Sequence, residues 1–113
     1  MIEINNYQEF LNIIHNNENK IVFIEFYAIW CKPCIKAMSL VEQLEKGIVS
    51  KNIIFFKVNI DEVSECVEIC DIKSIPKFSL YKNGDLIESI NGFDIEKIGS
   101  TIHTHLNKCD IIK

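Results

Sequence analysis

Hydrophobic residues in this chain follow two spacings, and these predict the order of strands and helices. The continuous apolar runs at 21–27 and 53–60 are typical of strands buried on both faces, as in a parallel sheet. A shorter apolar segment at 2–4 predicts a first strand. Apolar positions three or four residues apart predict helices at about 7–15, 34–46, 62–70 and 95–106.

Turn and capping residues separate these segments. Asn83-Gly84 stands between apolar runs at 78–81 and 86–90, which predicts a β-hairpin. Asn6 and Asp94 are expected to cap helices at their N-termini, and Gly47 is expected to follow a helix as its C-terminal cap. The resulting order is β-α-β-α-β-α-β-β-α, which predicts an α/β fold.

Composition narrows the function classes. The chain has 113 residues, 48% of them hydrophobic, and a formal net charge of −4, and all 12 basic residues are lysine. An acidic chain without arginine is a poor ligand for a phosphate backbone, so we expect no nucleic-acid partner. No apolar run is long enough to span a bilayer, and the first residues do not resemble a signal peptide. We therefore expect no membrane association and a cytoplasmic location.

The chain has five cysteines, and two of them form a Cys-x-x-Cys motif, Cys31 and Cys34. In a reducing compartment such a pair indicates redox chemistry or a metal site. The motif stands where a buried strand turns into a helix. Free backbone N–H groups and the positive end of the helix dipole favour a thiolate there, so the pKa of Cys31 should be low. Pro33 suits the first helical turn, where its missing N–H costs little.

A structural zinc site is the alternative for this pair. It needs four ligands. Two more could come from Cys66 and Cys70, or from His103 and His105. The spacings do not match a zinc ribbon, and zinc would not explain the neighbouring Trp30. We therefore expect no metal.

Several segments together resemble the thioredoxin family. The run from Phe26 to Cys34 resembles its active-site strand and W-C-G-P-C motif, with Lys32 in place of glycine. Ser74-Ile75-Pro76-Lys77-Phe78 is similar to its cis-proline loop. Tyr81 to Gly84 is similar to its hairpin, and Asn59-Ile60-Asp61 to the end of its third strand. The similarity runs in order from about Ile2 to Leu106.

The resemblance implies a thioredoxin fold in a single domain over 1–113, with a mixed sheet of about five strands and helices on both faces. It implies an enzyme that reduces protein disulfides, with Cys31 as the exposed nucleophile and Cys34 as the more buried resolving thiol. Electrons would come from NADPH through thioredoxin reductase. No cofactor would be bound, since the chain has no Gly-rich dinucleotide motif. We expect a monomer.

The resemblance also implies how substrate and proton are handled. Pro76 would be cis, and the backbone of Ile75 would pair with the substrate. The other implied substrate contacts are Trp30, Lys32, Pro33 and Gly92. Glu25 stands where the family usually has a buried aspartate, with Lys57 as its partner, so it would accept the proton of Cys34. The alternative is that Glu25 and Lys57 are only a buried pair.

Departures from the family pattern suggest further hypotheses. Lys32 beside Cys31 would stabilise the thiolate and make the couple more oxidising, unless it merely points into water. Lys36, Lys73 and Lys77 would form a basic rim that favours acidic partners, unless they are ordinary solvated lysines. Cys66 and Cys70 share a helix face, for packing or for regulatory oxidation. Cys109 to Lys113 would be a frayed tail.

Two rival functions remain on the same fold. One is an oxidase or isomerase of the secretory pathway, which the expected absence of a signal peptide disfavours. The other is a non-catalytic binding module, but this chain keeps Cys31, Cys34 and Pro76, which such modules often lose.

Overall fold

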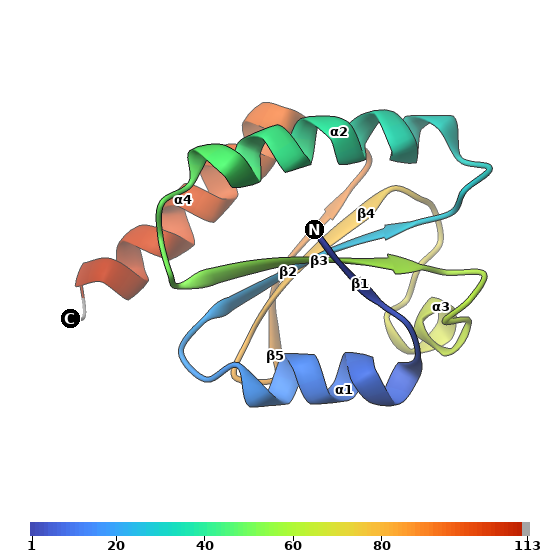
Figure 1. The fold of residues 1–113 in the computed structure, drawn as a ribbon, viewed down its shortest axis with the longest axis horizontal. Coiled ribbons are helices and arrows are strands. Elements are labelled where there is room, and N and C mark those ends of the chain that lie inside the picture. Colours follow the sequence, from blue (N-terminus) through green and yellow to red (C-terminus); the bar gives the residue numbers. More distant parts are fainter. Residues whose placement is uncertain (112–113) are drawn as a thin grey trace.

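The structure, a computed structural model, describes residues 1–111, and the side chains of residues 1–107. Within these residues the order of elements agrees with the one predicted (Figure 1). They are β1 (Ile2–Ile4), α1 (Tyr7–Asn16), β2 (Ile21–Tyr27), α2 (Lys32–Gly47), β3 (Ile53–Asn59), α3 (Glu65–Ile69), β4 (Lys77–Lys82), β5 (Asp85–Asn91) and α4 (Ile95–Ile111).

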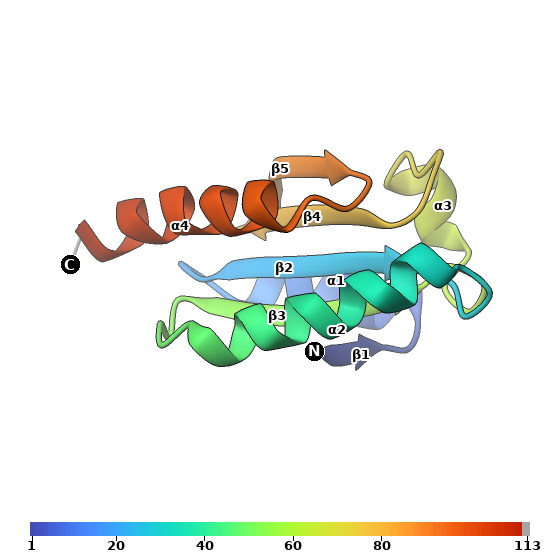
Figure 2. The same ribbon diagram turned by 90° about the horizontal axis from the view of Figure 1, so that it is seen from above.

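The strands form one mixed five-stranded sheet in the order β1-β3-β2-β4-β5. β1, β3 and β2 run parallel, whereas β4 and β5 are antiparallel to their neighbours. Helices α2 and α4 cover one face of the sheet, and α1 and α3 lie on the other (Figures 1 and 2). The expected architecture is therefore confirmed, including helices on both faces.

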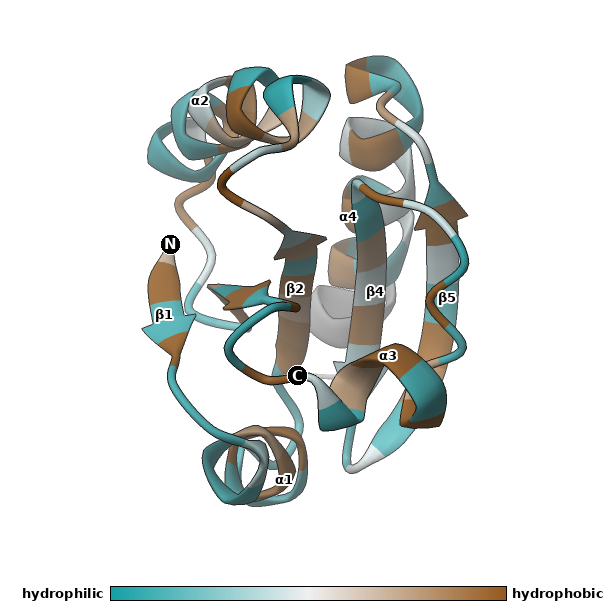
Figure 3. Cartoon of the chain, turned by 90° about the vertical axis from the view of Figure 1, so that its right-hand side faces the viewer, coloured by the Kyte–Doolittle hydropathy of each residue, from teal (hydrophilic) through white to brown (hydrophobic). Residues whose placement is uncertain are grey.

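Two apolar layers hold the helices to the sheet. Phe23 and Phe55 belong to the layer that faces α2 and α4, and Phe26 and Phe56 to the layer that faces α1 and α3. All seven residues of the central strand β2 are buried, because helices cover it on both sides. Figure 3 shows the apolar colouring of β2 and β4 between the two helical layers. Such a strand gives the site at its carboxyl end a rigid base.

The predicted turn and the two predicted N-terminal caps are confirmed. Asn83 and Gly84 both have positive φ, 52° and 86°, as a two-residue hairpin between β4 and β5 requires. The side chain of Asn6 accepts a hydrogen bond from the Glu9 amide at 2.8 Å. The side chain of Asp94 accepts one from the Lys97 amide at 3.1 Å.

Some boundaries differ from the prediction. α2 begins at Lys32, before the second cysteine, because Cys31 itself is the N-cap. Gly47 is the last residue of α2 and not its cap. α3 is limited to Glu65–Ile69, since the residues before it form turns. The expected tail after residue 108 is wrong in part, because α4 continues to Ile111; the Cys109 side chain and residues 112–113 lie outside the described part.

Candidate active site

The Cys31–Cys34 pair lies where β2 passes into α2. The two cysteines form a disulfide. Cys31 is the N-cap of α2, and its Sγ accepts a hydrogen bond from the Cys34 amide at 3.3 Å. Pro33 lies in the first turn, where no helical acceptor is available for an N–H. In the reduced form, this amide and the free N–H groups of the first turn stabilise negative charge on Cys31.

The two sulfurs differ in access. Cys31 is 7% exposed and Cys34 is fully buried, so an incoming disulfide can reach only Cys31. Cys31 is thus the more accessible thiol, although it is less exposed than the resemblance implied. The residues packed around the pair come from β2, α2 and three loops: Tyr27, Ala28, Met38, Ile60 and Ile75.

The loop before β4 lies against the cysteines. The Ile75–Pro76 peptide bond is cis, as expected. Ile75 packs into the cysteine cluster, so its backbone lies beside the reactive pair. The Pro76 carbonyl accepts a hydrogen bond from the Gly92 amide at 3.0 Å, and Gly92 has a positive φ of 80°. Gly92 therefore anchors this loop to the end of β5.

Trp30 lies on the surface beside the cysteines. It is 69% exposed, which rules out a place in the core. Its indole N–H donates to Asp61 Oδ2 at 2.8 Å, so the ring has a defined orientation although it is open to solvent. Next to it is a shallow cavity of about 260 Å³, lined by Trp30, Ile60, Ile72, Lys73, Ser74 and Ile75.

Asp61 is a site residue that the sequence analysis did not single out. It is the second residue after β3, and its amide donates to Asn59 Oδ1 at 3.0 Å within a tight turn. The carboxyl end of a buried parallel strand was the signal that could have found it.

Glu25 is fully buried on β2, in register with Lys57 on β3. Neither of its carboxyl oxygens has a hydrogen-bond partner. Burial raises the pKa of Glu25 to about 8, although the charge of Lys57 opposes this and that of Glu42 adds to it. A carboxyl with this pKa can take up and release a proton near neutral pH.

Lys57 is a neighbour of Glu25 but makes its closest described contacts elsewhere. Its Nζ lies 3.8 Å from Met38 Sδ and 6.0 Å from the centroid of the Tyr27 ring. The expected partnership is therefore one of charge across the sheet, without a direct ion pair.

The expected basic rim is wrong at Lys77. This lysine is only 7% exposed, and its Nζ donates to the carbonyls of Cys70 and Asp71, each at 3.0 Å. It caps the end of α3, because the carbonyls there lack helical partners. Lys32, Lys36 and Lys73 are exposed, so any basic rim consists of these three at most.

Cys66 lies in α3 and Cys70 is the C-cap that follows it, on the face of the sheet opposite α2. Both are free thiols; Cys66 is buried and Cys70 half-buried. The Cys66 thiol donates to the Cys70 sulfur, which lowers the pKa of Cys70 to about 7, and Tyr81 and Lys77 add to this. The same interaction and burial raise the pKa of Cys66.

The ligands that a zinc site would need are not brought together. Cys31 and Cys34 lie at the start of α2, Cys66 and Cys70 in and directly after α3, and the two histidines on α4. Among residues 1–107 no three His, Cys, Asp or Glu side chains are grouped so that they could hold a metal ion. Within the described chain, no helix has the length and apolarity needed to cross a membrane.

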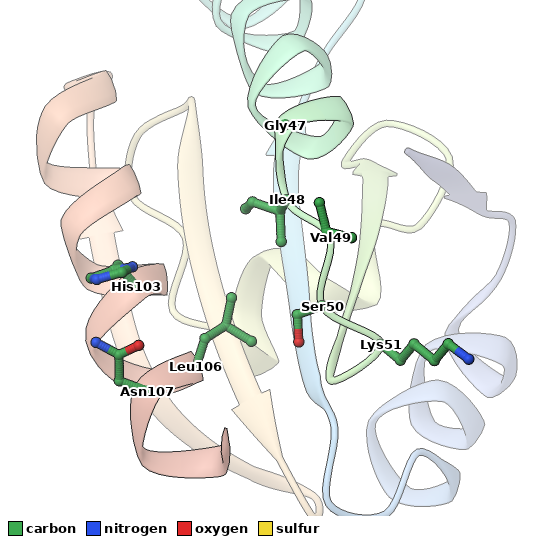
Figure 4. A pocket seen from close by; sticks show the side chains of 8 residues that line it. All are labelled: Gly47, Ile48, Val49, Ser50, Lys51, His103, Leu106 and Asn107. Atoms are coloured by element: carbon green, nitrogen blue, oxygen red, sulfur yellow. The ribbon is translucent and has the colours of Figure 1, made fainter. Parts of the chain in front are cut away.

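A larger cavity, about 600 Å³, lies at the opposite end of α2 from the cysteines. Figure 4 shows it between the loop after α2 and the last turns of α4. His103 is exposed on its rim, and Val49 is 95% exposed. Ser50 and His103 both line it, but the hydrogen bond described for the Ser50 hydroxyl comes from the Asn52 amide at 3.1 Å, so the two are not joined as nucleophile and base.

Comparisons with known proteins agree with this geometry. The family model described as Thioredoxin matches residues 1–104. A thioredoxin from Ictalurus punctatus is 33% identical over 93% of this chain and 98% of its own length. Thioredoxin 1 from Plasmodium falciparum is 39% identical over 74% of this chain and 77% of its own.

Solved structures give the same result. The crystal structure of Fasciola hepatica thioredoxin superposes with a TM-score of 0.86 at 27% identity, covering 93% of this chain and 99% of that one. The fold, the paired cysteines and these relatives agree. The chain belongs to the thioredoxin family and is a thiol–disulfide oxidoreductase that acts on protein disulfides through Cys31 and Cys34.

Proposed function

We propose that the chain reduces protein disulfides with Cys31 as nucleophile and Cys34 as resolving thiol. The Cys31 thiolate attacks one sulfur of the substrate disulfide, which forms a mixed disulfide and releases one substrate thiolate. Cys34 then attacks Cys31, the second substrate thiolate leaves, and the Cys31–Cys34 disulfide forms. Two electrons pass to the substrate. The observation that carries this assignment is the position of Cys31 at the N-cap of α2, where the Cys34 amide donates to its sulfur.

Glu25, with Lys57 beside it, is the proton acceptor for Cys34 in this scheme. Cys34 is fully buried and must lose its proton before it can attack. A carboxyl with a pKa of about 8 has a proton affinity close to that of a thiol, so transfer between the two is nearly balanced. Neither oxygen of Glu25 has a hydrogen-bond partner that would compete for this proton.

The surface around Cys31 recognises the substrate. The Ile75 backbone before the cis Pro76 offers hydrogen-bonding groups to an extended chain. Trp30 and the cavity beside it supply apolar contact, and Lys32 and Pro33, exposed in the first turn of α2, add to the surface. Gly92 holds the Pro76 loop in place.

The same proposal includes the cellular setting. Residues 1–113 act as a single domain and a monomer in the cytoplasm. NADPH, through a thioredoxin reductase, returns the disulfide to the dithiol. The similarity to a thioredoxin from Ictalurus punctatus, which covers 98% of that protein, supports this cycle.

The test is to trap the mixed disulfide. With Cys34→Ser, a peptide disulfide should remain attached to Cys31, and mass spectrometry should show the adduct. With Cys31→Ser, no adduct should form. Cys70→Ser is the matched control and should turn over like the parent protein. An adduct on Cys34 in the Cys31→Ser protein, formed as fast, would contradict the assigned order of attack.

The electron source is tested separately. The oxidised protein is mixed with NADPH and a purified thioredoxin reductase, and loss of NADPH absorbance is followed. One equivalent should be consumed per Cys31–Cys34 disulfide. If dithiothreitol reduces the pair but the reductase does not, the proposed electron source is wrong.

A further inference from the structure

A row of charged side chains crosses the sheet beside the cysteine pair. Glu3 on β1 is in register with Lys57 on β3, and Lys57 is in register with Glu25 on β2. Residues in register point to the same face of a sheet. Lys57 therefore stands between two carboxyl groups, one on an edge strand and one on the buried central strand.

Tyr27 connects this row on the same face. Its hydroxyl donates to Glu3 Oε1 at 2.6 Å, which is a short bond typical of an ionised acceptor. Its ring lies 6.0 Å from Lys57 Nζ, within range of a cation–π contact. Tyr27 also packs against Cys31 and Cys34, so it links the row to the reacting sulfurs.

Glu3 is incompletely satisfied in this arrangement. Its Oε2 is buried and has no hydrogen-bond partner, while Oε1 is occupied by Tyr27. A free carboxylate oxygen next to a lysine attracts that lysine. The hydrogen bond from the Tyr27 hydroxyl weakens this attraction, because it already stabilises part of the negative charge of Glu3.

We propose that Glu3 and Tyr27 are positioning residues that divide the charge of Lys57 between Glu3 and Glu25, and so set the proton affinity of Glu25. Glu3 draws Lys57 toward β1. Tyr27 limits that pull by occupying Glu3 and by holding Lys57 over its ring. Glu25 receives the remaining share of the lysine charge.

The other groups around Glu25 do not replace this control. On α2, Glu42 adds negative charge, and on β4 the register neighbour of Glu25 is the apolar Phe78. Glu62, after β3, acts on Tyr27. The cysteines carry no charge in the disulfide form. Lys57 is thus the one cation among the described residues whose charge acts on Glu25, and its position decides the result.

Two substitutions should shift the pKa of Glu25 in opposite directions. Glu3→Gln removes the carboxylate that competes for Lys57. Lys57 then stabilises the charge of Glu25 alone, so the pKa of Glu25 should fall. Tyr27→Phe keeps the ring but frees Glu3 Oε1 to attract Lys57, so the pKa of Glu25 should rise. Each shift should change the acid dissociation constant about three- to tenfold. The double variant should behave like Glu3→Gln, because Tyr27 has nothing left to restrain.

The measurement is a pH titration of the Glu25 carboxyl carbon by ¹³C NMR in the oxidised protein, assigned with Glu25→Gln. Glu45→Gln is the matched control: Glu45 is a part-buried carboxylate that binds the N-terminal amine at 3.0 Å, and it is not among the charges named as acting on Glu25. It should leave the Glu25 titration unchanged. Shifts in the same direction for both variants, or none for Glu3→Gln, would overturn the inference. If Tyr27→Phe does not fold, Glu3→Gln decides alone.

The functional consequence rests on the proposed role of Glu25 in deprotonating Cys34. The second readout is therefore the pH profile of the resolving step, followed by stopped-flow release of a chromogenic thiol. Its midpoint should move with the NMR titration in each variant. If the NMR titration moves and the pH profile does not, the proposed role of Glu25 fails while the charge row stands.

Discussion

The chain contains two pairs of neighbouring cysteines, and they lie at opposite kinds of helix end. Cys31 is the N-cap of α2, a helix of 16 residues. Cys70 follows the last residue of α3, a helix of five. Cys31 and Cys34 form a disulfide, whereas Cys66 and Cys70 remain free thiols.

Different groups activate the two pairs. Backbone N–H groups at a helix start favour a thiolate on Cys31. The end of α3 has the unfavourable polarity, and side chains offset it: Tyr81 lies 3.8 Å from the Cys70 sulfur, and Lys77 binds the Cys70 carbonyl at 3.0 Å. The Cys66 thiol contributes most to the lowered pKa of Cys70.

The surroundings of Cys70 differ from those of Cys31. Cys70 opens into a cavity of about 350 Å³ with apolar walls, between α1 and the β4–β5 hairpin. The cis-proline loop, in contrast, packs through Ile75 against Cys31 and Cys34. Cys70 has a low pKa and a second thiol, Cys66, in reach. The first pair differs in the surface that surrounds it, which can bind a substrate chain.

Substituting the nucleophilic cysteine should have the largest effect on activity. Cys31→Ser should lower the rate of protein-disulfide reduction by at least about 10³-fold, because the attacking thiolate is lost. Cys70→Ser should change it less than about twofold. Steady-state reduction of a protein disulfide with dithiothreitol as donor measures both. A large loss with Cys70→Ser would show that the second pair takes part in turnover.

The buried Glu25 near the first pair should also make the free energy of unfolding depend on pH. The folded pKa of Glu25, about 8, exceeds its ordinary value of 4.5, so the folded state holds the proton more tightly. Its contribution to the free energy of unfolding is therefore full below pH 4.5 and is lost as pH rises to about 8. Glu25→Gln should remove this loss and stabilise the protein at pH 9 by up to about 5 kcal/mol.

Urea unfolding of the oxidised protein at pH 5, 7 and 9 measures this difference. Glu45→Gln is the control and should keep the pH dependence of the parent. Equal slopes for the parent and Glu25→Gln would show that the buried carboxyl titrates at an ordinary pKa. In the same Glu25→Gln protein, the resolving step should be slower by roughly 10²-fold at pH 7.

The pH titration of Cys70 tests whether side chains lower the pKa of this thiol. With Cys31 and Cys34 oxidised and Cys109→Ser, alkylation of Cys70 should reach half its maximal rate near pH 7. Tyr81→Phe removes a hydrogen-bond donor and should raise this midpoint by about half a pH unit. Quantitative mass spectrometry of the labelled peptide follows the reaction. A midpoint near the ordinary cysteine pKa in the parent protein would contradict activation by side chains.

The smallest effect concerns Lys32. Its charge is exposed beside Cys31, so it should stabilise the thiolate only weakly. Lys32→Gly should lower the reduction potential of the pair by no more than about 20 mV, measured against glutathione buffers. Lys36→Gly, one helical turn further on, is the control for a general change of charge and should have a smaller effect. A higher potential in Lys32→Gly would reverse the hypothesis.

Local patterns explain why much of the fold could be predicted. The hairpin depends on Asn83 and Gly84 alone, and the caps at Asn6 and Asp94 act within one turn. Helix ends were less accurate, because Cys31 serves both as N-cap and as reactive thiol. Sequence patterns do not distinguish these two roles.

Lys77 shows where prediction from sequence stops. Its neighbours in the chain suggested a place on a basic surface, yet it binds carbonyls at the end of α3. The bond between Trp30 and Asp61 could not be predicted either, because it joins two loops at the ends of different strands.

The reactive motif, its place between a strand and a helix, and the order of elements could be predicted from the sequence, because each depends on residues near one another in the chain. The groups that act on the motif come together only in the folded sheet. Glu3, Lys57 and Glu25 come from three strands, and their row depends on the register between those strands. Pairwise register across a sheet depends on packing of the whole core, which no short segment encodes.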